Sequence, residues 1–184
     1  DKKCDTKLQY DFDFKDKVGN KVFASLVYSC LGLLSKLSDE SWGLDIPLTG
    51  NFIDYRGSMV NFCPIGRNAS KLDRKAWASL EAKHNIRKKL ISKLKNDFSK
   101  HSIAFKLGGD TSIDIFPKGW DKTFVLRNFQ DNDEIWFFGD RCQEHGNDKE
   151  LYDAIKLRNA GGSFETTGPS KTIELVNNNI LINL

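Results

Sequence analysis

The hydrophobic residues of this sequence recur every three or four positions in two long stretches, and this spacing predicts helices. Residues 18–37 form the first stretch, and a helical region over 71–99 forms the second. The second half of that region carries a single apolar stripe, made of Ile86, Leu90, Leu94 and Phe98. Such a stripe is typical of an amphipathic helix that packs on a sheet. Shorter helical segments are predicted over 149–159 and 171–176.

Between and after the long helices, polar and apolar residues alternate in several segments, and a period of two predicts strands. The predicted strands are a hairpin over 51–66 and two segments over 103–107 and 112–116. Alternation puts Ser112 and Asp114 on one strand face and Ile113 and Ile115 on the other. Two polar side chains on one strand face usually meet solvent, but they could instead line a pocket.

The last third of the chain has a different pattern. EIWFFGD, residues 134–140, is a nearly unbroken apolar run, which suits a parallel strand that is buried on both faces. A helical segment, a loop over GGSFETTGPS and a second helical segment follow. The sequence therefore predicts an α+β module followed by part of an α/β module.

One short motif, DFDFKD over residues 11–16, has the Asp-x-Asp spacing of a nucleophile and general acid in phosphoryl transfer. Its surroundings do not support that role. The preceding TKLQY is of mixed polarity, and Phe14-Lys15 stands where a tight Gly-Thr turn is needed. We expect a half-exposed strand or a linker, with Phe12 and Phe14 turned inward.

The net charge of +3 is unremarkable, but its distribution along the chain is uneven. Residues 1–55 hold 7 Lys/Arg and 9 Asp/Glu, residues 56–100 hold 12 and 3, and residues 101–184 hold 9 and 13. A basic middle beside an acidic end suits an anion site next to a cation site. The alternative is that these charges cover solvated helix faces. The basic helix face lacks interleaved aromatic residues, so we expect no nucleic-acid partner.

Other sequence features narrow the class of protein. No apolar run approaches the length of a membrane span, so no membrane association is expected. The four cysteines are widely spaced, which argues against a zinc site and favours reduced thiols.

Oxygen-bearing side chains gather after the apolar run. Asp140 closes the predicted strand, and Asn147 and Asp148 follow seven residues later. Ligands of open α/β sheets bind at the carboxyl ends of strands, and magnesium prefers oxygen ligands. These residues are therefore candidate magnesium ligands. The alternative is that Asp140 only caps the next helix.

Three arginines are candidates for phosphate binding. Arg56 ends a strand, Arg67 follows Pro-Ile-Gly, and Arg74 lies in the first turn of a helix that Ser70 is expected to cap. The planar guanidinium fork suits phosphate. Without further information, three ordinary surface arginines would be the favoured interpretation.

Four motifs, taken in their order along residues 51–148, strongly resemble those of eukaryotic-type phosphomannomutases of the haloacid dehalogenase superfamily. The motifs are NFIDYRGSMVNFCPIGR (51–67), NIRKKL (85–90), FKLGGDTSIDIFPKGWDK (105–122) and WFFGD…GND (136–148). The resemblance implies a haloacid-dehalogenase-like α/β core, Rossmann-like, of which only part is present, with an α+β cap built on an antiparallel sheet. It divides the chain into a linker (1–13), a cap (14–121) and the C-terminal part of the core (122–184).

The same resemblance implies roles for individual residues. The three arginines, Arg56, Arg67 and Arg74, match those that grip the distal phosphate of the substrate, and Ser112 and Asp114 match contacts to sugar hydroxyls. Lys122 matches a catalytic lysine beside the transferring phosphate. Asp140 matches a magnesium ligand, supported by the loop with Asn147 and Asp148.

The resemblance also implies an activity and partners. The family interconverts mannose 6-phosphate and mannose 1-phosphate through an aspartyl-phosphate. It uses Mg²⁺ and a hexose 1,6-bisphosphate activator. Its members are cytoplasmic homodimers, joined through their caps, that serve mannose metabolism and GDP-mannose biosynthesis.

The DxDGT motif of the family nucleophile is absent from these residues. We therefore expect the chain by itself to be inactive, and its EIWFFGD strand to lack a neighbouring strand. The alternatives are a haloacid-dehalogenase sugar phosphatase, and a non-catalytic fragment that binds phosphosugars or dimerises.

Overall fold

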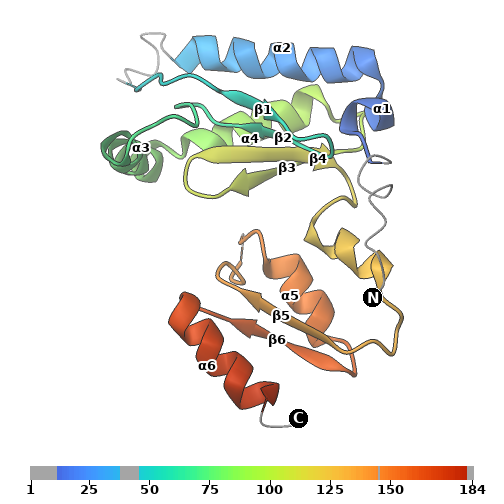
Figure 1. Cartoon of the computed structure of the whole chain (residues 1–184). Coiled ribbons are helices and arrows are strands. Elements are labelled where there is room, and N and C mark those ends of the chain that lie inside the picture. The colour runs from blue at the N-terminus through green and yellow to red at the C-terminus, as the bar shows by residue number, and fades with distance from the viewer. Residues whose placement is uncertain (1–11, 38–45, 145, 182–184) are drawn as a thin grey trace. The chain divides into compact units, whose positions relative to one another are not determined.

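The computed structural model describes residues 12–37, 46–144 and 146–181. They form two compact units, the first ending at Lys118 and the second beginning at Gly119 (Figure 1). Both units combine helices with strands, and the first contains an antiparallel sheet.

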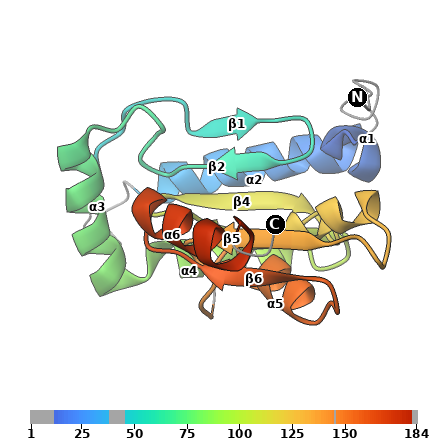
Figure 2. The same ribbon diagram turned by 60° about the horizontal axis from the view of Figure 1, so that its bottom comes forward.

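The sheet of the first unit has four strands in the order β1-β2-β4-β3, and Figure 2 shows β1, β2 and β4 as successive neighbours. The strands are β1 (Ile53–Tyr55), β2 (Val60–Phe62), β3 (Ile103–Gly108) and β4 (Ser112–Pro117). All pairings are antiparallel, and Asn61 lies opposite both Asp54 and Asp114. The three predicted strand regions are thus confirmed, and the alternation along them separates an apolar face from a polar face.

Four helices accompany this sheet: α1 (Phe14–Val18), α2 (Asn20–Leu37), α3 (Lys71–His84) and α4 (Ile86–Asp97). The helix predicted over 18–37 is confirmed as α2, and Gly19, with φ of 85°, separates it from α1, which was not predicted. The helical region predicted over 71–99 is divided at Asn85, with φ of 52°, a break that was not predicted because hydrophobic spacing continues across that residue. Asn85 tolerates the left-handed conformation better than most residues do, so it can end one helix and begin the next.

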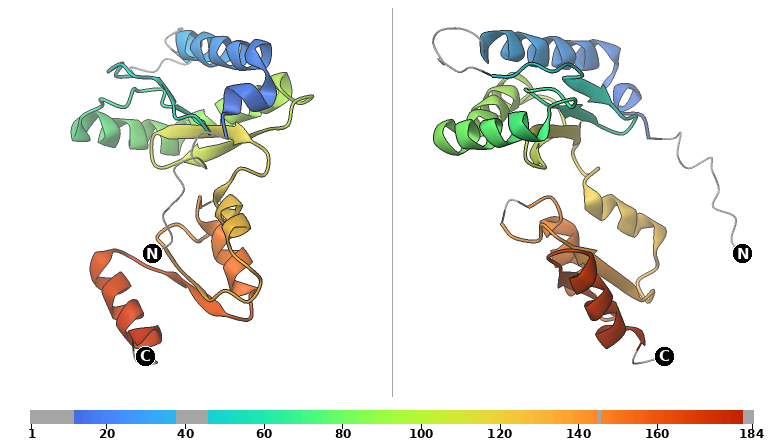
Figure 3. Two further views of the ribbon diagram at one scale, coloured as in Figure 1. Left: turned by 45° about the vertical axis from the view of Figure 1, so that its right-hand side comes forward. Right: turned by 60° about the vertical axis from the view of Figure 1, so that its left-hand side comes forward.

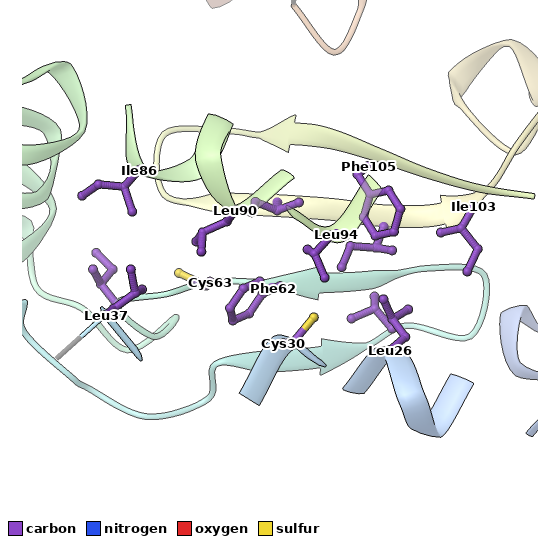
Figure 4. Packing of buried hydrophobic residues seen from close by; sticks show 14 of the residues in the cluster. Leu26, Cys30, Leu37, Phe62, Cys63, Ile86, Leu90, Leu94, Ile103 and Phe105 are labelled. Carbon is purple, nitrogen blue, oxygen red and sulfur yellow. The ribbon is translucent and has the colours of Figure 1, made fainter. Parts of the chain in front are cut away.

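The core of the first unit lies between its helices and the apolar face of the sheet. Figure 4 shows α4 and α2 residues meeting strand residues such as Phe62 and Phe105. The predicted stripe is confirmed, since each of its four residues is at most 5% exposed. The fully buried members of this core are Phe14, Leu26, Cys30, Phe62, Ile65, Trp77, Ile86, Leu94, Ile113 and Ile115.

The DFDFKD segment corrects one expectation. Its described residues do not form a strand, because Phe14 begins α1 and Asp13 is the N-cap. Asp13 Oδ1 accepts a hydrogen bond from Asp16 N at 3.1 Å, and its other oxygen accepts one from the Tyr55 hydroxyl. This Asp side chain therefore has a local capping role, which satisfies a backbone N–H of the first turn. Phe14 is fully buried, as predicted, and Phe12 is half-buried.

The second unit contains a parallel pair of strands, β5 (Ile135–Gly139) and β6 (Gly161–Glu165). Its helices are the 3₁₀ helix η2 (Lys122–Asn128), α5 (Lys149–Lys156) and α6 (Pro169–Asn179), and Figure 3 shows α5 and α6 on opposite sides of the strand pair. Leu151 and Ile155 of α5 pack on Ile135. On the other face, the ring of Phe164 stacks on those of Trp136 and Phe138.

Strand β6 overturns two expectations. We predicted a loop over GGSFETTGPS, but its first half forms β6. We also expected EIWFFGD to lack a neighbouring strand, and β6 is that neighbour, in register from Ile135↔Gly161 to Gly139↔Glu165. The strand was not predicted because it begins with Gly161-Gly162, and glycine is uncommon in strands. Gly161 is needed there because a Cβ would lie 1.9 Å from the Ile135 carbonyl oxygen.

Among the described residues, none of the helices combines the length and apolar character that crossing a membrane requires.

Candidate functional site

The polar face of the four-stranded sheet carries a row of side chains from neighbouring strands. The register places Asp54 beside Asn61, Asn61 beside Asp114, and Asp114 beside Lys106. Residues opposite one another on adjacent strands lie close enough for direct contact. A continuous polar row therefore crosses the sheet on the face opposite its apolar core.

Two of the predicted arginines converge on one member of this row. Arg56 Nε lies 2.9 Å and Arg67 Nε 3.5 Å from the same oxygen, Oδ2 of Asp54. Each arginine side chain keeps about two fifths of its surface exposed (40% and 39%). Two guanidinium groups around one carboxylate leave a net positive charge, which favours an anion.

Arg74 is held beside this pair by neutral oxygens. Its guanidinium group donates to the backbone oxygens of Ala69 (3.1 Å) and Arg67 (2.9 Å), and to the hydroxyl of Thr111 (3.3 Å). These contacts orient the group without neutralising its charge. The structure therefore brings Arg56, Arg67 and Arg74 into one connected cluster, as the sequence suggested.

Local structure positions the arginines. Gly66 has φ of 85°, and an added Cβ would lie 2.2 Å from the Gly50 carbonyl oxygen, so the turn before Arg67 requires glycine. Ser70 caps α3, its hydroxyl accepting from Asp73 N while the Asp73 carboxylate accepts from Ser70 N. The Ser70 side chain, and after it the Ser70 backbone N–H, stabilise the Asp73 carboxylate and lower its pKa. The cap confirms the predicted helix start and places Arg74 in its first turn.

Asn61 connects the arginine cluster to the two predicted sugar contacts. Its Oδ1 accepts from Arg67 Nη1 at 2.7 Å. Its Nδ2 donates to Ser112 Oγ at 2.9 Å and to Asp114 Oδ1 at 2.6 Å. Ser112 and Asp114 therefore do not simply face solvent, because both belong to a hydrogen-bonded network with Arg67.

Asp54 and Asn61 were not predicted as site residues. A period of two puts Asp54 on the same strand face as Arg56, which is a usable signal, and Asn61 is a polar residue between apolar neighbours. Gly108 was also missed, although it makes room for the network: an added Cβ would lie 2.5 Å from Asp114 Oδ1. Only the strand register shows which residues on different strands lie opposite one another.

In the second unit, Lys122 at the start of η2 pairs with Asp148, the residue before α5. The Lys122 ammonium pairs with Asp148 Oδ1, and Arg141 N donates to the other oxygen at 3.1 Å. Burial acts to raise the pKa of Asp148, which is only 4% exposed, but Lys122 and the Arg141 N–H outweigh burial and lower it. Asp148 is therefore held in its ionised form beside the Lys122 ammonium group.

Lys122 and Asp148 also line an open cavity of about 620 Å³ at the carboxyl end of β5. Its other lining residues are Phe137, Phe138, Gly139, Asp140, Thr166, Gly168, Pro169, Thr172 and Ile173. Asp140 thus lies at the strand end where ligands of such sheets bind. Two of the three predicted cation ligands, Asp140 and Asp148, thus line the same cavity.

The donor atoms near this cavity suit a hard cation. Asp140 and Asp148 supply carboxylate oxygens, and Asn147 Oδ1 is buried without a hydrogen-bond partner among the described residues. An unpartnered buried carbonyl oxygen is costly unless a ligand satisfies it. No group of three or more His, Cys, Asp or Glu side chains suited to metal binding occurs in the described ranges.

The fold and these two sites define a class of protein: an α+β unit with a cationic cluster, followed by a parallel-strand unit with a carboxylate-lined cavity. The model of the eukaryotic phosphomannomutase family matches residues 3–182. The chain belongs to the eukaryotic phosphomannomutase family.

Individual relatives agree with this membership. The chain is 38% identical to a phosphomannomutase of Dendrobium officinale over 163 residues, which cover 88% of this chain and 60% of that protein. It is 45% identical to the Arabidopsis thaliana phosphomannomutase over 131 residues (71% and 52%), and 42% identical to that of Encephalitozoon cuniculi (72% and 49%). The chain thus spans about half of the curated relatives it matches.

A more remote likeness is to a solved structure, an N-terminally truncated IMP-nucleotidase of Plasmodium falciparum. The TM-score is 0.48 at 13% identity, covering 87% of this chain and 39% of that one. A likeness of this strength adds nothing to the family assignment.

Proposed function

We propose that this chain supplies the cap and the C-terminal part of the core of a phosphomannomutase with a haloacid-dehalogenase-like fold. The complete protein would interconvert mannose 6-phosphate and mannose 1-phosphate. Family membership supports this proposal, as does a first unit with an anion site and a second unit with a cavity lined by Asp140 and Asp148.

The observation that carries the proposal is the sharing of one Asp54 oxygen by Arg56 and Arg67. The single charge of the Asp54 carboxylate does not neutralise both guanidinium groups, and Arg74 adds a third positive charge. A phosphate carries nearly two negative charges at neutral pH and suits the planar guanidinium forks. In this proposal the cluster holds the distal phosphate, while Ser112 and Asp114 bind sugar hydroxyls.

The second unit would hold the phosphate that is transferred. Lys122, beside Asp148, would offset phosphoryl charge in the cavity, and Asp140, Asn147 and Asp148 would hold Mg²⁺. When bound, Mg²⁺ would neutralise the charge that develops on phosphoryl oxygens. The oxygen donors and the buried unpartnered Asn147 Oδ1 support this choice of ion.

Several further properties follow the family rather than the geometry, and we propose them on that basis alone. They are a hexose 1,6-bisphosphate activator, a homodimer joined through the cap, a cytoplasmic location and a place in GDP-mannose biosynthesis.

The direct test uses the complete gene product with mannose 1-phosphate and a hexose 1,6-bisphosphate. We expect mannose 6-phosphate to accumulate without stoichiometric release of inorganic phosphate. Release of inorganic phosphate as the main product would instead indicate a sugar phosphatase. Binding of hexose phosphates with no turnover in the complete protein would indicate a non-catalytic role.

A further inference from the structure

Asn61 lies at the centre of the network in the first unit and is only 3% exposed. Its three hydrogen bonds leave one possible orientation of the amide. Arg67 can only donate, so it must face Oδ1, and the Asp114 carboxylate can only accept, so it must face Nδ2. Ser112 Oγ donates to the Gly108 carbonyl at 2.7 Å and therefore accepts from Nδ2.

Each atom of the Asn61 amide thus has a separate task. Oδ1 accepts from the guanidinium group of Arg67, which belongs to the arginine cluster. The two N–H bonds of Nδ2 reach the two residues that would meet sugar hydroxyls. Movement of Arg67 toward or away from a phosphate would therefore be transmitted through one planar group to Ser112 and Asp114.

We infer that Asn61 is a positioning residue that couples the phosphate grip of Arg67 to hydroxyl recognition by Ser112 and Asp114. Through this coupling, the first unit distinguishes a phosphorylated polyol from free phosphate. The inference rests on the proposed function, since it deepens the role of the same site. It adds a residue whose contribution is selectivity and not charge, because Asn61 is neutral.

The informative substitution is Asn61→Asp, which preserves size and shape. An Asp carboxylate still accepts from Arg67, but it cannot donate and it faces the like charge of Asp114. Affinity for inorganic phosphate should fall by only about threefold, because the new carboxylate partly offsets the charge of Arg67 while all three arginines remain. Affinity for mannose 6-phosphate should fall by about tenfold or more, because hydroxyl recognition is disturbed.

Calorimetric titration of the 184-residue chain with the two ligands measures this ratio. Asn96→Asp, on the exposed face of α4, makes the same chemical change away from the network and should leave both affinities unaltered. Thermal unfolding of each variant checks the fold. Equal losses for the two ligands, or no loss for either, would overturn the coupling role.

A double-mutant cycle tests the same idea without altering Asn61. Arg67→Ala and Ser112→Ala remove the two ends of the coupled path. We expect their effects on mannose 6-phosphate affinity to be non-additive by about threefold or more, whereas purely additive losses would contradict the inference.

The wild-type chain separates this inference from the proposed function. If the wild type binds mannose 6-phosphate no better than inorganic phosphate, the proposed function of the first unit fails, and the inference fails with it. If the wild type discriminates but the Asn61→Asp variant discriminates equally well, only the inference fails.

Discussion

The ammonium group of Lys122 pairs with the carboxylate of Asp148 across 26 residues of sequence. Asp148 is buried and Lys122 is half-exposed, with a side-chain exposure of 45%. A half-exposed lysine can hold a buried carboxylate ionised and still meet a ligand in the adjoining cavity. The pair therefore serves the stability of the second unit and the electrostatics of its proposed phosphate site.

Replacing Lys122 with methionine should destabilise the protein and raise the pKa of Asp148, because burial of that carboxylate would lose its main counterweight. In the wild type the folded pKa is lowered, so the stabilisation is present above the unfolded value near 3.8 and is lost as pH falls through the folded value. In the variant the loss should begin at higher pH. We expect about 1–2 kcal/mol at neutral pH, discounted for the exposure of Lys122.

Urea unfolding across pH, with carboxyl carbon NMR of Asp148, measures both effects. Lys75→Met, on an exposed position of α3, removes the same charge and should change neither. An unaltered Asp148 pKa in the Lys122 variant would contradict the proposed counterweight.

Reversing the charge of Arg67 or Arg74 to glutamate should weaken mannose 6-phosphate binding by about tenfold or more, since each arginine would lose a charge-assisted contact with phosphate. Lys75→Glu makes the same charge change next to Arg74 in sequence and on the exposed surface. Titration calorimetry at fixed ionic strength compares the three variants. Similar losses in all three would point to long-range charge and not to a specific phosphate grip.

Gly66→Ala should destabilise the protein and weaken phosphate binding together, because the added Cβ would lie 2.2 Å from the Gly50 carbonyl oxygen and the turn leads directly into Arg67. Gly57→Ala is the matched control: Gly57 also has positive φ, at 74°, but nothing lies within 4 Å of an added Cβ. We expect about 1 kcal/mol for the Gly57 variant, from backbone strain, and at least about twice that for the Gly66 variant. Thermal and urea unfolding check this order.

Ser70→Ala should lower stability by about 1 kcal/mol, because α3 would lose the hydroxyl that accepts from Asp73 N. Because the same cap holds the first turn with Arg74, affinity for inorganic phosphate should fall as well. Ser79→Ala, in the same helix but on its exposed side, should be neutral or slightly stabilising. Phosphate affinity that stays at the wild-type level in a destabilised Ser70 variant would separate the cap from the anion site.

Asn147→Ala should weaken Mg²⁺ binding, because it removes the buried oxygen that has no hydrogen-bond partner among the described residues. Calorimetric titration of the chain with Mg²⁺ measures the affinity for Mg²⁺ without any assay of turnover. Asn128→Ala, at the exposed end of η2, is a control in the same unit. Stability without Mg²⁺ should not fall in the Asn147 variant, since an unsatisfied polar atom would be removed.

Much of the first unit could be predicted from local patterns. The apolar stripe of α4 and the alternation of β4 depend on periodicity, which is a property of neighbouring residues in one element. The Ser70 cap depends on residues three positions apart. The break at Asn85 escaped prediction because a change of one residue's backbone angles does not interrupt hydrophobic spacing.

The second unit shows where local patterns are insufficient. Strand β6 has little strand propensity in Gly161-Gly162, and it forms because β5 offers an unpaired backbone edge whose hydrogen bonds need a partner. Packing against tertiary neighbours can override such propensities.

By itself, the sequence determined the long helices, the strands of the first unit and β5, together with the candidate arginines and acidic residues and the resemblance to the family that the comparisons then confirmed. Tertiary structure alone decided that Asp54 is shared by Arg56 and Arg67, and that Asn61 joins Arg67 to Asp114. The physical reason is register. Periodicity tells which face of a strand a side chain occupies, whereas its partner on that face depends on pairing between segments as distant as 53 residues.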